Sequence, residues 1–279
     1  MRKPTPDKSA FSLYKAPKPS RKIPFVLGGI CLFGIATYCG ALYGRYTKDR
    51  KEYLSNPDSH VELRNNTKEI YNQIAKKYDS LNSRDEWLLG ITKQRRKLVS
   101  RASGDVLDLA CGTGLNVDFY DPERVKSIVF LDQSSQMLTI ARERWNNRPE
   151  ISDKVQAKFL VGDAEDYAAE HGEGKFDFVV QTNVLCSCQD PGRLVKATMK
   201  LVKPGGRIIM MDHGKSSHDW VNKILDTYAT SHRMKWGCQW NLDIERILKS
   251  GGIPANAIKR RLFGTVYEVD LEKGKLESS

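Results

Sequence analysis

The sequence predicts an α/β fold with a doubly wound, mainly parallel sheet, preceded by an N-terminal transmembrane helix. Two observations predict the fold: strand-like apolar runs alternate with helical stretches over residues 105–211, and a glycine-rich turn follows the first run. A third observation, a run of 22 uncharged residues at 23–44, predicts the membrane span. The 279 residues suffice for one domain with such additions.

Each element of this fold follows from a local pattern. The predicted strands are residues 105–110, 127–131, 158–161, 176–181 and 207–211, with helices between them, for instance at 134–145 and 192–201. Ahead of the first strand, Ile70, Ile74 and Tyr78 recur at four-residue spacing and predict an amphipathic helix over 66–81. A second helix is expected at 87–101. Short apolar strands alternating with helices are typical of parallel sheets covered on both faces.

The N-terminal segments differ from the rest in charge. Residues 1–22 hold seven basic residues against the single acid Asp7, which is similar to a mitochondrial targeting segment. Residues 23–44 are long enough to cross ~30 Å of hydrocarbon at ~1.5 Å per residue, and too long for a cleaved signal peptide. Residues 45–65 form a polar stalk, and 66–279 form the folded domain.

The distribution of charge and the spacing of the cysteines argue against some classes of partner and site. Residues 1–51 carry 11 basic and 2 acidic residues, so the other 228 residues carry 34 against 32, or a net charge of +2. A nucleic-acid-binding domain is expected to be clearly basic, so nucleic acid is disfavoured as a partner.

The spacing of the cysteines fits neither a zinc knuckle nor a disulfide framework, which predicts free thiols and no metal site. The six cysteines are Cys31, Cys39, Cys111, Cys186, Cys188 and Cys238.

A glycine-rich loop, Asp108 to Gly114, ends the first predicted strand. Such a loop lets a nucleotide-like ligand approach the backbone at the carboxyl edge of a parallel sheet. It is not the dinucleotide fingerprint, because position 117 is Val where a third glycine is needed. Asp108 would repel a phosphate but suits a cofactor with a cationic ammonium and sulfonium.

Acidic residues also follow the next two strands. Asp132 can accept hydrogen bonds from ribose hydroxyls, and Asp163, beside Ala164, can accept one from an adenine amino group. Each acid alone could equally be a solvated strand end or a helix cap. Three acids at successive strand ends after a glycine loop favour a bound nucleotide-like cofactor.

Four segments carry a family resemblance: 106–114, 131–138, 162–165 and 201–206. They resemble class I S-adenosylmethionine-dependent methyltransferases, in particular the ubiquinone/menaquinone C-methyltransferases and membrane-associated methyltransferase-like proteins. Residues 112–116 with Tyr120, and Gly237-Cys238 followed by Asn241, are more particular to that branch. The resemblance covers roughly 66–270 and implies a seven-stranded Rossmann-like sheet with S-adenosyl-L-methionine as cofactor.

The resemblance also implies roles for single residues. Gly112 and Gly114 would permit the backbone approach, Asp132 would bind the ribose, and Asp163 with Ala164 the adenine. Asp108 would face the methionine end, over which Tyr78 would close. The further cofactor-binding residues that the resemblance implies are Ala110, Asn116, Gln133, Met137 and Gln181. Cys111 stands where such loops often have glycine, but it is small enough for the same role.

The methyl acceptor is less determined. Asp212 and His213 follow the fifth strand and are the candidate bases, although a histidine in such a place is more often a solvated or helix-capping residue. Cys186 and Cys188 either line the pocket or fill apolar space. Cys238, with Asn241, is a candidate for an acceptor lid.

The membrane anchor favours a hydrophobic acceptor: a lipid, a quinone or a membrane protein. An alternative is a methyltransferase-like assembly factor for a mitochondrial membrane complex, and a soluble small-molecule or RNA methyltransferase comes third. The segment at 1–22 and a resemblance to fungal proteins indicate the mitochondrial inner membrane. The more basic flank precedes the span, which places the domain in the intermembrane space. The oligomeric state is left open.

Overall fold

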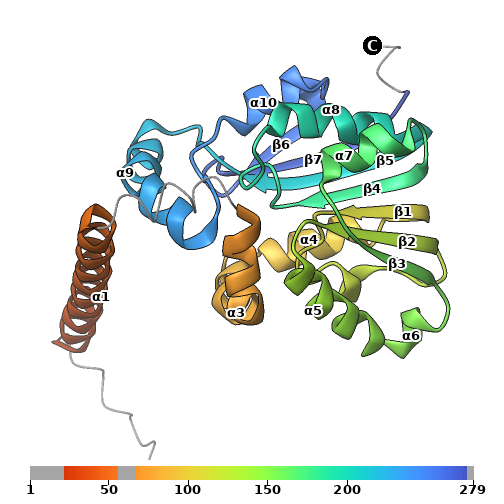
Figure 1. The fold of residues 1–279 in the computed structure, drawn as a ribbon. Coiled ribbons are helices and arrows are strands. Elements are labelled where there is room, and N and C mark those ends of the chain that lie inside the picture. The colour runs from red at the N-terminus through yellow and green to blue at the C-terminus, as the bar shows by residue number, and fades with distance from the viewer. Residues whose placement is uncertain (1–21, 56–66, 275–279) are drawn as a thin grey trace, which may run out of the picture. The chain divides into compact units, whose positions relative to one another are not determined.

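The computed structural model describes residues 22–55 and 67–274 (Figure 1). Three stretches lie outside the described residues: 1–21, which is all but the last residue of the predicted targeting segment at 1–22; 56–66, which holds the end of the predicted stalk at 45–65; and the C-terminal residues 275–279. The chain divides into two compact units, Met1–Leu54 and Ser55–Ser279. The division falls within the predicted stalk, and each unit is described by itself.

Within the first unit the structure describes one helix, α1 (Lys22–Ser55). It contains the predicted span at 23–44 and continues through the first half of the predicted stalk as helix. Large apolar side chains such as Ile30, Leu32 and Phe33 are exposed on it. Among the residues that the structure describes, no helix combines the length and the apolar character needed to cross a membrane. The predicted transmembrane span is therefore not confirmed.

The second unit is built on a seven-stranded sheet with the order β3-β2-β1-β4-β5-β7-β6. The first five of these run parallel, whereas β7 is antiparallel to β5 and β6 is antiparallel to β7. The strands are β1 (Gly104–Leu109), β2 (Val125–Asp132), β3 (Gln156–Val161), β4 (Phe176–Thr182), β5 (Val202–His213), β6 (Ile258–Arg261) and β7 (Val266–Glu272). The predicted mainly parallel α/β fold is confirmed.

Helices cover both faces of this sheet (Figure 1). Because side chains alternate along a strand, Val106 of β1 joins one apolar cluster while Leu107 joins the other. The first cluster lies under α4 (Ile91–Val99) and α5 (Ser135–Asn146), and the second under α7 (Ala164–His171), α8 (Pro191–Leu201) and α10 (Ile244–Ser250). The short elements are η1 (Val117–Phe119), α6 (Pro149–Ser152) and η2 (Ala255–Ala257).

Two helices, α3 (Thr67–Leu88) and α9 (Asp219–Trp236), complete this unit. Helix α3 is longer than the helix predicted at 66–81. Helix α4 therefore begins at Ile91, later than the predicted start at residue 87. The boundary is Gly90, whose φ of 70° is left-handed and suits a residue without Cβ. Because α3 precedes β1 but touches α5 and α9, it links parts of the domain far apart in sequence.

Candidate cofactor site

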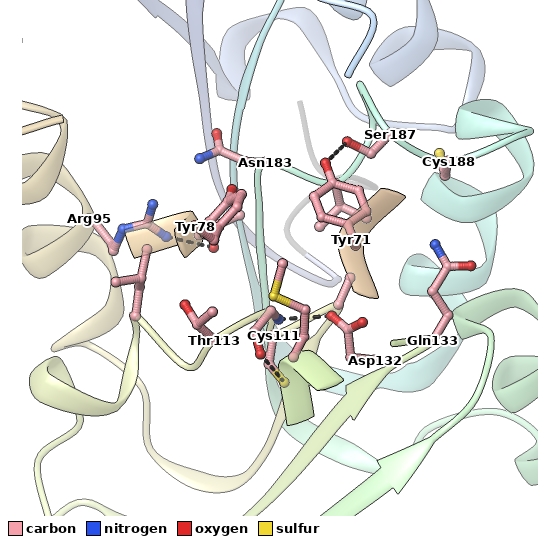
Figure 2. A pocket seen from close by; sticks show the side chains of 16 residues that line it. Tyr71, Tyr78, Arg95, Cys111, Thr113, Asp132, Gln133, Asn183, Ser187 and Cys188 are labelled. Atoms are coloured by element: carbon pink, nitrogen blue, oxygen red, sulfur yellow. Dashed lines mark hydrogen bonds between the residues drawn. The ribbon is translucent and has the colours of Figure 1, made fainter. Parts of the chain in front are cut away.

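A pocket lies at the carboxyl ends of β1, β2 and β4 (Figure 2). Its empty volume is about 660 Å³, open solvent at the mouth included. This is the edge at which parallel α/β sheets hold ligands. Six of the residues that the sequence analysis assigned to the cofactor line it: Tyr78, Ala110, Gly112, Asp132, Gln133 and Met137.

A second hollow adjoins the first. It contains Asp163 and Ala164, and its empty volume is about 370 Å³. The two hollows share Asp132 and Gln133 in their walls. Together they therefore form one elongated site with Asp132 near its middle.

The loop after β1 shapes the floor of the pocket. Ala110 and Gly112 have positive φ values of 51° and 58°, so the chain turns sharply after the strand. A Cβ added to Gly112 would meet no atom within 4 Å, which shows that the space above this residue is open. A glycine here leaves room for a ligand to reach the backbone.

Asp132 is held by the backbone. The amide of Gly112 donates to its Oδ2 at 2.8 Å, drawn dashed in Figure 2, and the amide of Ser134 donates to its Oδ1 at 2.8 Å. Burial raises the pKa of Asp132, and these two N–H groups oppose the shift. Each carboxylate oxygen has two lone pairs, so each can still accept a hydrogen bond from a ligand hydroxyl.

Gly114 has a different environment from Gly112. Its φ is 76°, and a Cβ added there would lie 3.1 Å from both Cα and Cβ of Ala141 on α5. It lines neither hollow. Gly114 therefore allows α5 to pack against the loop, whereas Gly112 faces the open space.

Asp108 and Asn116 lie beneath the loop rather than in the pocket wall. Asp108 is fully buried and accepts hydrogen bonds from Asn116 Nδ2 at 3.0 Å and from the Tyr120 hydroxyl at 2.8 Å. Burial raises the pKa of Asp108 to about 6, although both of these hydrogen bonds lower it. The side chain of Asp108 points to the same face of β1 as that of Val106, and it does not line the pocket. Asp108 and Asn116 therefore support the loop from beneath instead of contacting the pocket.

Arg95 on α4 is a pocket residue that the sequence analysis missed. Its side chain is buried, and the guanidinium donates to Glu86 at 2.7 Å and to Thr182 at 2.8 Å. A further bond of 3.3 Å goes to Asn116 Oδ1. The sequence does carry a signal, because Arg95 is spaced with Ile91 and Leu98 on the apolar face of the helix. A cation in such a stripe needs buried partners.

Gln181 points away from both hollows. It is 1% exposed, and its Oε1 accepts from Thr198 on α8 at 3.1 Å. The following residues, Thr182 and Asn183, line the pocket instead. The ligand contact was thus predicted at the correct strand end, but the alternation of side chains turns Thr182 rather than Gln181 to the ligand face.

Helix α3 is attached to the loops around the pocket. Its contacts are Tyr71 with Ser187, Asn72 with Ser134 and Asp79 with Thr113, each at 2.6 Å between oxygen atoms. The rings of Tyr71 and Tyr78 lie 6.1 Å apart and both line the pocket (Figure 2). Burial raises the pKa of both phenols, so they are neutral at physiological pH. They give this part of the site an aromatic wall.

The two candidate bases line neither hollow. Asp212 Oδ2 accepts the amides of Val184 and Leu185 at 2.8 and 2.7 Å, and its Oδ1 accepts that of His213 at 3.0 Å. Burial raises the pKa of Asp212 to about 7. His213 places Nε2 2.8 Å from Cys238 Sγ. Asp212 thus orders the loop after β4.

The cysteines after β4 separate into two environments. Cys188 lines both hollows, whereas Cys186 is buried behind the wall. A hydrogen bond with Cys238 lowers the pKa of Cys186, and the charge of His213 acts in the same direction. Burial alone would lower the pKa of His213, but the charge of Cys186 raises it to about 9. Among the described residues, no disulfide links any of the six cysteines.

Comparison with known proteins identifies the family. Residues 107–210, from β1 into β5, match the family described as a methyltransferase domain. The chain belongs to the class I S-adenosylmethionine-dependent methyltransferases. The cofactor of this family is the one expected from the sequence, S-adenosyl-L-methionine.

Individual relatives agree with this family. The chain is 35% identical over 213 residues to the mitochondrial methyltransferase OMS1 of Saccharomyces cerevisiae, which covers 72% of this chain and 45% of OMS1. It is 30% identical over 167 residues to the demethylmenaquinone methyltransferase of Leptospira interrogans, with 58% and 66% covered. The chain thus spans less than half of the first relative and about two thirds of the second.

Solved structures agree in fold. An O-methyltransferase family protein from Burkholderia thailandensis superposes with a TM-score of 0.56 at 14% identity, covering 82% of this chain and 72% of the other. At this identity the likeness supports the fold alone.

Proposed function

We propose that this methyltransferase binds S-adenosylmethionine along the two adjoining hollows and transfers its methyl group to an apolar acceptor. The observation that carries the proposal is the position of Asp132. Its carboxylate lies where the hollows meet, is oriented by two backbone amides and faces the open space above Gly112. A ribose bound there would extend its adenine toward one hollow and its methionine part toward the other.

Different residues would bind different parts of the cofactor along the site. Asp163 and Ala164 would hold the adenine, Asp132 the ribose hydroxyls, and the backbone near Gly112 the methionine part. When bound, the cofactor supplies a methyl group activated on a sulfonium. The chain's own contribution is to orient this group and the acceptor and to exclude water between them, which can supply a large part of the rate acceleration.

A general base is not required unless the acceptor must lose a proton. Tyr71 and Tyr78 form an aromatic wall suited to a flat apolar acceptor. Asp212 and His213 lie behind the pocket wall, so their role as bases stays a prediction.

A quinone-like ring is the acceptor that we propose, because a demethylmenaquinone methyltransferase is among the relatives. A mitochondrial location is proposed from the similarity to OMS1. Attachment to the inner membrane through α1, with the domain in the intermembrane space, stays a prediction. Alkaline carbonate extraction of isolated mitochondria and protease protection test these two points separately.

The proposed activity is tested with the full-length chain and S-adenosylmethionine labelled in its methyl group. The acceptors are a demethylated naphthoquinone with an isoprenoid tail and an organic extract of mitochondrial membranes. Labelled product in the organic phase supports the proposal. If the cofactor binds but no labelled product forms from either source, the apolar acceptor is contradicted, and a role in assembling a membrane complex becomes the better account.

A further inference from the structure

Three metal-ligating side chains meet behind the pocket wall, although they are far apart in sequence. Cys186 lies in the loop after β4, His213 ends β5, and Cys238 follows α9. Their ligand atoms all lie within 4.8 Å of one another. The cofactor site does not use them, because none of the three lines either hollow.

We propose that Cys186, His213 and Cys238 form a binding site for Zn²⁺. Two thiolates and one imidazole are a ligand set that zinc takes, with the fourth position left to water or another ligand. Soft sulfur ligands disfavour the hard cations Mg²⁺ and Ca²⁺. Two thiolates also neutralise the charge of the ion, so the loaded site can be buried without net charge.

The spacing of the ligand atoms is close to what zinc requires. Zinc–sulfur and zinc–nitrogen bonds of about 2.3 and 2.0–2.1 Å place tetrahedral ligand atoms roughly 3.6 Å apart. The distance from His213 Nε2 to Cys238 Sγ is 2.8 Å, and the largest separation in the trio is below 4.8 Å. Binding thus needs only small side-chain movements.

The surroundings favour these three ligands over other candidates. Cys186 and Cys238 are 3% and 5% exposed, so the site is shielded from water. The nearby carboxylate of Asp212 accepts three backbone amides and does not belong to the group of ligand atoms that all lie within 4.8 Å of one another. Ser187 Oγ lies 3.4 Å from Cys186 Sγ and 2.6 Å from the hydroxyl of Tyr71.

The ion would fasten the segment after α9 to the loop that carries Ser187. A backbone bond already joins these segments, from the amide of Gln239 to the carbonyl of Cys186 at 2.7 Å. Because Ser187 and Tyr71 line the pocket, zinc would stabilise the pocket wall from behind. Sequence spacing could not reveal this site, since the ligands are 27 and 25 positions apart rather than grouped in short motifs.

The test is the zinc content of the full-length chain. The protein is produced in zinc-supplemented medium, purified without chelators and without a metal-affinity column, and analysed by inductively coupled plasma mass spectrometry. About one zinc per chain is expected, and Cys238→Ser and His213→Gln should each lower it at least tenfold. Cys188→Ser is the matched control, because this cysteine lies in the same loop outside the trio.

Circular dichroism identifies which variants are folded, so that loss of zinc is not confused with loss of structure. Replacement by Co²⁺ gives a second readout: a thiolate-to-cobalt charge-transfer band that Cys238→Ser should weaken and Cys188→Ser should preserve. The proposal is overturned if the folded wild-type chain holds no zinc or if the trio variants keep the wild-type zinc content. A Cys186–Cys238 disulfide trapped by alkylation at lysis would overturn it as well.

Discussion

The buried carboxylate of Asp108 should make the stability of the ligand-free protein depend on pH. Its pKa is raised by burial from an ordinary value of 3.8 to about 6. The folded protein therefore binds the proton more tightly than the unfolded chain does. The stabilising contribution of this group is complete below about pH 3, is lost as the pH rises through about 6, and is gone by about pH 7.

The size of the effect follows from the two pKa values. Each pH unit between them is worth about 1.4 kcal/mol, so the free energy of unfolding loses about 3 kcal/mol through this carboxyl. Asp108→Asn keeps the shape of the side chain but removes the charge. The difference in free energy of unfolding, variant minus wild type, should thus rise by about 3 kcal/mol between pH 3 and pH 7.

Urea unfolding followed by circular dichroism at several pH values measures this difference. Asp153→Asn, at an exposed carboxylate, serves as the control for the loss of one negative charge at the surface. Tyr120→Phe removes a hydrogen bond that lowers the pKa of Asp108, so in that variant the pH-dependent change should move to higher pH. A flat difference for Asp108→Asn would refute the reasoning, because it would show that the ionised carboxylate is fully compensated in the fold.

The remaining predictions concern the loop after β1 and the ion pair beside it. Gly112→Ala should weaken cofactor binding at least tenfold, because its Cβ enters the open space, at a stability cost of about 1 kcal/mol for the positive φ. Gly114→Ala should instead lower the free energy of unfolding by about 2 kcal/mol, since its Cβ meets Ala141. Calorimetry and urea unfolding separate the two effects, and equal behaviour of the variants would contradict their assignment. Arg95→Met should cost about 3–5 kcal/mol, because it leaves the carboxylate of Glu86 unpaired in a largely buried place. An unchanged urea midpoint in this variant would show that Glu86 is adequately solvated without its partner.

The central strands could be predicted from sequence because they are short and buried on both faces. Strands β1 to β5 appear as apolar runs between turn and helix signals, and the structure has strands at all five places. Strand β6, with the sequence Ile258-Lys-Arg-Arg261, is polar because it lies at the edge of the sheet. Such a strand carries no apolar run, so the count of seven could come only from the family resemblance.

The candidate site was predictable where it consists of backbone and strand ends. The loop around Gly112 and the carboxylate of Asp132 follow directly from the end of a parallel strand. Tyr71 and Arg95 were missed because they come from helices ahead of the sheet. Their approach to the pocket depends on tertiary packing that no local pattern records.

The zinc ligands were missed for a related reason. Cys186, His213 and Cys238 belong to three successive segments of the chain and meet only once β4, β5 and α9 are in place. Membrane attachment is the opposite case, because the sequence predicts a feature that the structure does not confirm. It was predicted from the uncharged run at 23–44, and within the described residues no helix meets the requirements of a span.

The measurement that tests the account most directly is calorimetric titration of the full-length chain with S-adenosylmethionine, beside Asp132→Ala and the control Asp153→Asn. The wild type and the control should bind with similar affinity. Asp132→Ala should bind at least tenfold more weakly, because two hydrogen bonds to the ribose, each worth about 1 kcal/mol, are lost. Unchanged affinity in Asp132→Ala, or no binding by the folded wild-type chain, would contradict the proposed cofactor site.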